Sequence, residues 1–216
     1  MGRNLSTIPK TVNTQDGQQL SQHFDITKMD KLLDSQRGKW ARPVELFSLL
    51  GIEPSMNVAD IGCGPGFFAL PLALLVGDHG RVFAVDDSPE MLHKLTDRVR
   101  MQGVTSRLEI HECDAAETGL EDHSIDILLC IFLYHEVADR ERLLTEFTRI
   151  TKPKGKVVMV DWRKGIVSDI GPRDSVRLTA EQMIAPMKNA GLDVSELDFS
   201  NEYHVFVGRV PSESGS

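Results

Sequence analysis

Cysteine is scarce in this sequence of 216 residues, which holds only Cys63, Cys113 and Cys130. No two of the three have the CxxC spacing, and an odd number without such a pair disfavours a disulfide framework or a zinc knuckle. We interpret them as one loop residue and two strand residues. Converging thiols, which a soft ion such as arsenite requires, are not indicated, and we expect no metal site.

Positive charge and long apolar runs are also in short supply. Lys and Arg number 24 against 32 Asp and Glu, a formal net charge of -8, which disfavours nucleic acid as the main partner. The longest apolar stretches, residues 67–76 and 125–134, are about half as long as a membrane helix, and the polar start lacks a secretory signal. We therefore expect no membrane span and a cytoplasmic location.

Two small basic groups interrupt the acidic background: Arg37, Lys39 and Arg42, and Lys152, Lys154 and Lys156. We interpret both groups as solvated surface.

Residues 1–25 are rich in Thr, Gln, Asn and Ser and are predicted to form a flexible arm, and residues 211–216 are predicted to form a flexible tail. Residues 26–210 suit one domain, as a monomer or a homodimer.

Short β-branched apolar runs alternate with stretches of helical period, which predicts successive βα units. The pattern indicates an α/β fold: a Rossmann-like, seven-stranded, mainly parallel sheet with helices on both faces. A very short turn around Asn201 and Glu202 requires the last two strands to form an antiparallel edge hairpin. The predicted strands are 57–61, 81–86, 107–113, 125–134, 156–162, 193–200 and 203–209.

Helix signals fall between these strands. Ser88 and Pro89 predict a helix start and Gly103 its end. Thr179 and Gln182 form a capping box for a helix that Gly191 stops. A third helix is indicated by apolar residues that recur on one face, namely Leu143, Leu144, Phe147 and Ile150.

The strongest local signal is a glycine-rich turn, Asp60-Ile61-Gly62-Cys63-Gly64-Pro65-Gly66, with an apolar strand before it and a helical run after it. Glycines there let the backbone approach a ligand closely. Asp86 ends the next strand about 20 residues past Gly66, the spacing at which a carboxylate meets ribose hydroxyls. Other polar groups also follow strands, at Asp114, at Tyr134–Glu136 and at Asp161, so they are expected at one edge of the sheet.

The glycine pattern also discriminates between nucleoside ligands. A dinucleotide fingerprint, G-x-G-x-x-G, would need glycine at position 67, where this chain has Phe67. A nicotinamide-dependent oxidoreductase is therefore disfavoured.

Three segments resemble the class I S-adenosylmethionine-dependent methyltransferases: Asp60–Gly66, Val85–Leu92 and the turn Thr151–Gly155. The chain looks most similar to the type 11 enzymes, which include ubiquinone/menaquinone-biosynthesis-like members. That family usually has leucine-lysine-proline-glycine-glycine at the turn, so Thr151 and Lys154 depart from it. The resemblance covers about residues 40–210 and implies a methyltransferase acting on a small molecule that the sequence does not identify.

The resemblance also implies roles for particular residues toward S-adenosylmethionine. Asp60 and the glycine turn would hold its methionine part, and Asp86 its ribose. Asp87 and Met91 would flank the adenine, Asp114 and Ala115 would hydrogen-bond it, and Phe132 and Leu133 would close over the cofactor. The implied cofactor residues are thus Asp60, Gly62, Cys63, Gly64, Gly66, Asp86, Asp87, Met91, Asp114, Ala115, Phe132 and Leu133.

His135 is the predicted proton acceptor if the acceptor loses a proton, because histidine titrates near neutrality. A structural role at a strand end is the alternative for it. Tyr134 is predicted to lie near the acceptor with His135, and Glu136, Tyr134 and Asp161 are weaker candidates for the proton acceptor. Trp40 and Trp162 could line an acceptor site or belong to the core, and residues 19–40 are a candidate lid.

Two other kinds of function remain open from the sequence. A catalytically silent protein could keep this fold to bind a partner. Methylation of protein or RNA is a further alternative, disfavoured by the acidic balance.

Overall fold

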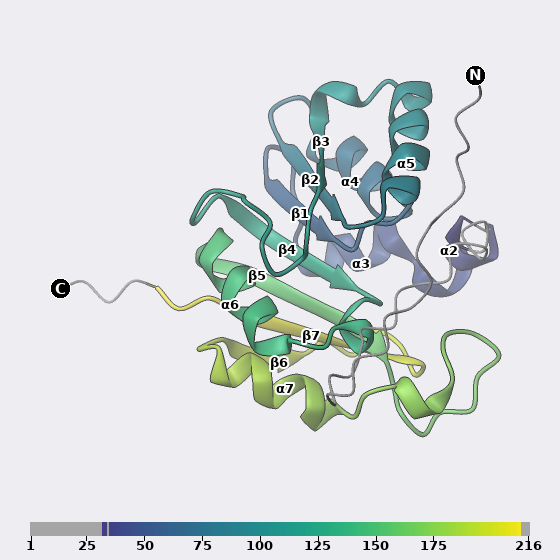
Figure 1. Cartoon of the computed structure of the whole chain (residues 1–216), viewed down its shortest axis with the longest axis vertical. Coiled ribbons are helices and arrows are strands. Elements are labelled where there is room, and N and C mark those ends of the chain that lie inside the picture. The colour runs from purple at the N-terminus through teal and green to yellow at the C-terminus, as the bar shows by residue number, and fades with distance from the viewer. Residues whose placement is uncertain (1–31, 34, 213–216) are drawn as a thin grey trace, which may run out of the picture.

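The computed structural model describes residues 32, 33 and 35–212, and the predicted arm at 1–25 and most of the tail at 211–216 lie outside them. Seven strands form one sheet in the order β3-β2-β1-β4-β5-β7-β6 (Figure 1). The pairs from β3 to β5 are parallel, and β7 is antiparallel to both β5 and β6. The strands are β1 Asn57–Ile61, β2 Arg81–Asp86, β3 Leu108–Glu112, β4 Ile125–Ile131, β5 Thr151–Trp162, β6 Asp193–Glu196 and β7 Tyr203–Arg209.

The sheet is confirmed as mainly parallel with an antiparallel C-terminal pair, and β1, β2 and β7 have the predicted bounds. β4 ends three residues earlier than predicted, because Phe132 has a φ of 59° and turns the chain into a 3-10 turn at Tyr134–Glu136. β5 begins at Thr151, within the predicted turn, since Thr151 pairs with Ile125 across an irregular register. β3 is one residue shorter at each end.

The link between the last two strands is longer than predicted. β6 ends at Glu196, and residues 197–202 connect it to β7. Their register is antiparallel, with Asp193 opposite Arg209, as expected. Since β7 lies between β5 and β6, β7 runs against both neighbours and β6 forms the edge.

Two layers of helices cover the sheet. The predicted caps are confirmed: the Ser88 hydroxyl accepts from Met91 N, and Thr179 and Gln182 form the capping box. Gly103 ends its helix with a φ of 69°, and Gly191 follows the end of α7. The helices are α2 Ser35–Ala41, α3 Pro43–Leu50, α4 Ala69–Val76, α5 Pro89–Gln102, α6 Arg140–Ile150 and α7 Ala180–Asn189.

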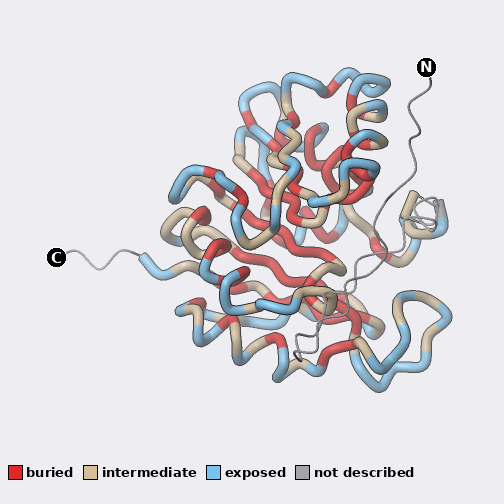
Figure 2. The backbone as a smooth tube through the Cα atoms, viewed as in Figure 1, coloured by how far each residue is buried: buried red, intermediate tan, exposed pale blue. Residues whose placement is uncertain are grey.

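The core is divided by the sheet, whose central strands are buried (Figure 2). One cluster joins α3, α4 and α5 to one face of the sheet, and a second joins α6 and α7 to the other. The predicted apolar face of α6 lies in the second cluster. In the part of the chain that the structure describes, no helix is long and apolar enough to cross a membrane.

Candidate functional site

The glycine turn between β1 and α4 has the backbone that its sequence requires. Gly62 and Gly66 have φ values of 73° and 83°. A Cβ on Gly66 would lie 2.3 Å from Leu95 Cδ1, and one on Gly62 would lie 2.9 Å from Leu133 Cδ2. Their positive φ values favour glycine, and a Cβ at either position would also have to displace a leucine side chain. Leu133, from the segment after β4, therefore packs directly on the turn.

Asp86 ties this turn to the end of β2. Its Oδ2 accepts from Gly64 N at 2.8 Å, and its Oδ1 accepts from Ser88 N at 3.0 Å. Burial raises the pKa of Asp86 in spite of these two hydrogen bonds. The carboxylate is thus fixed beside the glycine turn, at the carboxyl end of its strand.

Asp60 is the second acid of the turn and is only 1% exposed. Burial raises its pKa to about 7, although the cation of Arg37 and a hydrogen bond from Ala69 N oppose the rise. Among the residues that the structure describes, Asp60 Oδ2 has no hydrogen-bond partner. A buried acceptor of this kind is a place for a ligand donor. Cys63, in the same turn, is buried, and its thiol pKa is raised by burial, so it stays a protonated thiol.

Arg37 corrects one prediction, because it is not part of a solvated surface. Its guanidinium carbon lies 4.5 Å from the centre of the Phe67 ring and 5.4 Å from that of Phe68. Burial lowers its pKa to about 10, while Asp60 opposes that change. The prediction was wrong because the residues next to Arg37 in the sequence, Gly38 and Lys39, are exposed, while its contact Phe67 is distant in the chain.

An aromatic cluster of Trp40, Phe132, Trp162 and Tyr203 adjoins Arg37. Phe132 stacks on Trp162 with centroids 4.6 Å apart, and Trp40 lies 5.3 Å from Trp162. The Tyr203 hydroxyl donates to Trp40 O at 2.8 Å, which fixes α2 to the sheet. The two tryptophans singled out by the sequence thus meet, with Tyr203 as a member that the sequence did not indicate.

His135 forms a buried pair with Asp161 at the ends of β4 and β5. His135 Nδ1 lies 2.8 Å from Asp161 Oδ1, and His135 N donates to Oδ2 at 2.8 Å. Burial alone would lower the pKa of His135, but the hydrogen bond and charge of Asp161, with Glu136, outweigh it and the pKa is raised. Since Nδ1 carries the proton toward Asp161, Nε2 of a neutral His135 is left as the acceptor.

Tyr134 does not accompany His135. It is fully buried in the cluster under α6 and α7, with the cation of Arg140 4.9 Å from its ring centre. Burial raises its pKa to about 12. β4 was predicted to continue to Tyr134, but it ends at Ile131. The Tyr134 side chain therefore lies in the core and not at the edge of the sheet. The geometry disfavours its predicted place near an acceptor.

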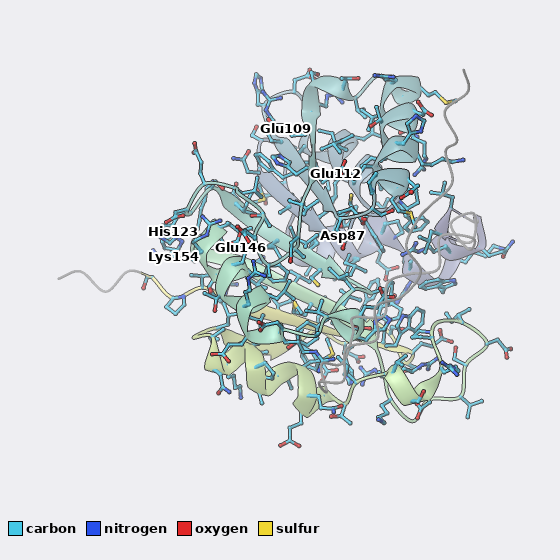
Figure 3. All side chains as sticks on the ribbon, viewed as in Figure 1. Asp87, Glu109, Glu112, His123, Glu146 and Lys154 are labelled. Carbon is cyan, nitrogen blue, oxygen red and sulfur yellow. The ribbon has the colours of Figure 1, made fainter. Side chains whose placement is uncertain are left out.

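The remaining predicted residues lie on the segments after β2 and β3. Asp87 is exposed beyond the end of β2 (Figure 3), and Met91, in the first turn of α5, is buried. Asp114 Oδ1 accepts from Ala116 N at 2.7 Å, while Ala115 is half-buried. Figure 3 places His123 and Lys154 at the opposite end of the sheet, away from Asp87.

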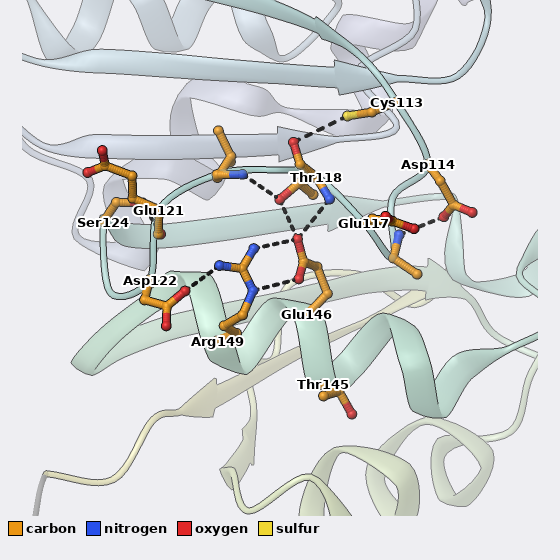
Figure 4. Close-up of polar contacts among 12 residues, drawn as sticks. Cys113, Asp114, Glu117, Thr118, Glu121, Asp122, Ser124, Thr145, Glu146 and Arg149 are labelled. Carbon is orange, nitrogen blue, oxygen red and sulfur yellow. Dashed lines mark hydrogen bonds and ion pairs between the residues drawn. The ribbon is translucent and has the colours of Figure 1, made fainter.

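A buried acid that the sequence did not single out anchors the segment carrying Asp114 (Figure 4). Glu146 Oε1 accepts from the backbone N and the hydroxyl of Thr118, at 2.7 and 2.5 Å. Arg149 donates to both oxygens of Glu146 at 2.8 Å. Burial would raise the pKa of Glu146, but these hydrogen bonds outweigh it and the pKa is lowered. The network holds residues 113–124 against α6.

The cysteines and other soft ligands do not assemble. Cys63 lies in the glycine turn, Cys130 in β4 and Cys113 one residue beyond β3, all with free thiols. Within residues 32, 33 and 35–212 there is no group of three or more His, Cys, Asp or Glu side chains placed to hold a metal ion.

Comparisons with known proteins match this arrangement. The family model described as a methyltransferase domain covers residues 59–159. The demethylmenaquinone methyltransferase of Bacillus cytotoxicus is 30% identical over 145 residues, 67% of this chain and 59% of that protein. The ubiquinone/menaquinone biosynthesis C-methyltransferase UbiE of Vibrio campbellii is 26% identical over 150 residues, 68% of this chain and 58% of that protein. The chain thus spans less than two thirds of the length of these relatives.

A solved SAM dependent methyltransferase from Aquifex aeolicus shares the fold. It has a TM-score of 0.82 and 25% identity, over 87% of this chain and 100% of that one. The sheet order, the glycine turn with its two acids, the family model and these relatives agree. Residues 59–159 thus match the type 11 methyltransferase domain, and the chain has the fold of the class I methyltransferases.

Proposed function

We propose that this chain transfers the methyl group of S-adenosylmethionine to a small-molecule acceptor by in-line displacement. One observation carries the proposal: a turn whose Gly62, Gly64 and Gly66 all have positive φ lies between a buried, unpaired Asp60 oxygen and Asp86. An amino-acid nucleoside offers a cationic amine to the first acid and ribose hydroxyls to the second. The residues present therefore fit that cofactor.

The chain's own residues divide the task of holding it. In the proposal, Asp60 and the turn Gly62–Gly66 hold the methionine part, and Asp86 accepts from the ribose. Leu133 packs on the turn from the segment after β4, and Phe132, next to it in the chain, would close over the cofactor. The adenine would be held from the following segments, by Asp87, Met91, Asp114 and Ala115.

S-adenosylmethionine, when bound, supplies a methyl group whose leaving group is already activated, so the protein's main task is to align the acceptor. His135 adds a place for a proton. Asp161 holds its ring by Nδ1, which leaves Nε2 to take the proton that the acceptor loses. We do not assign such a role to the buried Tyr134.

We further propose an acceptor with a flat ring, of the class of reduced quinones. The names of the two relatives refer to menaquinone and ubiquinone synthesis. In this chain Trp162 is only 4% exposed and belongs to the core, while Trp40 and Phe132 pack on it and are half-buried, so these two rings are the ones left to stack against a flat apolar ring. We place the activity in the cytoplasm, with the chain as a monomer or a homodimer.

Calorimetric titration tests cofactor choice. Wild type, Asp86→Ala and the control Asp97→Ala, an exposed acid of α5, are titrated with S-adenosylmethionine and with nicotinamide dinucleotides. We expect wild type and Asp97→Ala to bind only S-adenosylmethionine, and Asp86→Ala to bind it about 10-fold to 100-fold more weakly. Binding of the dinucleotide alone, or unchanged binding by Asp86→Ala, would contradict the proposal.

Transfer itself is tested with a methyl-labelled cofactor. The chain is incubated with demethylated quinols of short side chain, with a metabolite pool, and with total protein and RNA. Label in the quinols supports the full proposal, and label in another metabolite supports the activity but overturns the acceptor class. Label only in protein or RNA, or no label despite tight binding of the cofactor, favours the two alternative functions.

A further inference from the structure

Arg37 brings a cation from α2 to the glycine turn, where it lies close to the rings of Phe67 and Phe68. The Phe67 ring holds the guanidinium at 4.5 Å, and the rings of Trp40 and Phe132 lie 5.9 Å away. Its Nη1 donates to Leu32 O at 3.0 Å. The aromatic surroundings fix the guanidinium in place without using its Nε–H.

Two buried polar atoms near the turn have no hydrogen-bond partner among the described residues, Arg37 Nε and Asp60 Oδ2. Their charges are opposite and attract each other, yet the two groups are not hydrogen-bonded to one another. A buried donor or acceptor without a partner is costly, and few persist without a reason. Here a buried donor on a cation and a buried acceptor on an anion both lack hydrogen-bond partners beside the same turn.

We propose that Arg37 and Asp60 bind the two ends of an α-amino acid: Arg37 donates to its carboxylate and Asp60 accepts from its ammonium group. This inference rests on the proposed function, in which the amino acid is the methionine part of S-adenosylmethionine. The two charges come from separate elements, α2 and β1, so a zwitterion that bridges them joins α2 to the sheet. Arg37 is thereby a ligand-binding residue.

The same bridge also bears on the aromatic cluster. Trp40 lies one helical turn after Arg37 on α2 and belongs to the aromatic cluster with Phe132 and Trp162. A cofactor that binds Arg37 therefore adds to the Tyr203–Trp40 hydrogen bond, which already holds α2 against the sheet.

The experiment compares S-adenosylmethionine with decarboxylated S-adenosylmethionine, which lacks only the carboxylate. Both are titrated by calorimetry into wild type, Arg37→Gln and Lys39→Gln, an exposed residue of the same helix. We expect Arg37→Gln to weaken binding of S-adenosylmethionine about 10-fold to 100-fold and to leave binding of the decarboxylated compound within about twofold. Lys39→Gln should bind both as wild type does.

Each other outcome has a distinct meaning. Equal weakening of both compounds by Arg37→Gln would show that Arg37 only orders α2, and tighter binding of S-adenosylmethionine would show that it competes with the cofactor; either overturns the inference and leaves the proposed function standing. No binding of S-adenosylmethionine to wild type overturns both. Retained binding of the decarboxylated compound also shows that the variant is folded.

Discussion

Asp60 is buried, and the charges around it decide whether its side chain is ionised. Burial favours the protonated form, Arg37 favours the ionised form, and Asp86 opposes ionisation again. Without a further cation these effects leave the pKa at about 7. The cofactor's ammonium group would supply that cation.

Cofactor affinity should therefore depend on pH through Asp60. Below about pH 7 the free protein holds a proton that must leave when the ammonium binds, so affinity should rise with pH, by up to about tenfold per pH unit, and level off above pH 7. Calorimetry between pH 5.5 and 7.5, in buffers of different ionisation enthalpy, measures both the affinity and the proton released. Asp60→Asn should bind weakly at every pH, with no proton release. The same slope in this variant would assign the dependence to another group.

His135 and Asp161 make a second prediction at this scale. If neutral His135 accepts a proton, kcat should rise as pH rises through the pKa of His135, which lies above its ordinary 6.5. Asp161→Asn removes the charge that raises this pKa, so the midpoint of the kcat profile should move to lower pH. A profile that keeps its midpoint in Asp161→Asn and in His135→Gln would leave the pair with a structural role only.

The His135–Asp161 pair should also affect the free energy of unfolding. Because the pKa of His135 is raised on folding, its stabilisation is complete below pH 6.5 and is lost as pH rises through the folded pKa. Denaturant unfolding of wild type and His135→Gln over this window measures the difference.

At the scale of elements, the segment from residue 113 to 124 depends on α6 for its position. Glu146 binds Thr118 on that segment and Arg149 on its own helix. Its spacing from Leu143, Phe147 and Ile150 puts it on the buried face of α6. That position was a readable signal, since a polar residue on an apolar helical face needs a buried partner.

Glu146→Gln should lower the free energy of unfolding by about 2–3 kcal/mol, because a buried charge network loses its acid. The folded pKa of Glu146 is lowered, so this stabilisation is present above its ordinary 4.5 and fades as pH falls through the folded pKa. Hydrogen exchange should quicken in residues 113–124. Glu141→Gln, at an exposed position of the same helix, should change stability by less than about 1 kcal/mol. Equal loss in both variants would argue against the network.

Local sequence predicted elements well where local forces decide them. Caps at Ser88 and Thr179, and the glycine turn, depend on neighbouring residues, so their positions were confirmed. The end of β4 was missed because residues 132–134 are as apolar as a strand, while the φ of Phe132 turns the chain. The same early end explains why Tyr134 is in the core.

At the scale of the whole molecule, the fold brings the ends of β1, β2, β4 and β5 to one edge, and parallel topology made this predictable. Contacts between residues that are distant in the sequence could not be predicted. Arg37 stacks on Phe67, and Asp161 binds His135, across separations that periodicity does not report. The positions of Asp60 and Asp86 beside the turn could be predicted from spacing, but the cation above the turn could not.

Binding that joins several elements should stabilise the whole fold. At a cofactor concentration 100 times Kd, stability should rise by about 2.7 kcal/mol, which for a chain of this size raises Tm by roughly 5–10 °C. Thermal unfolding with S-adenosylmethionine measures this, and Asp86→Ala should show a much smaller rise. A similar rise with a nicotinamide dinucleotide would contradict the cofactor assignment.

Trp40 and Trp162 are the only two tryptophans of the sequence, and their rings lie 5.3 Å apart. Both indoles absorb and emit at wavelengths where the rest of the chain contributes little, and at this separation their excited states couple. Any departure of α2 from the sheet separates them and alters the emission and the near-ultraviolet circular dichroism. The protein thus carries an intrinsic optical probe, and stopped-flow fluorescence can time the arrival of each ligand without a label.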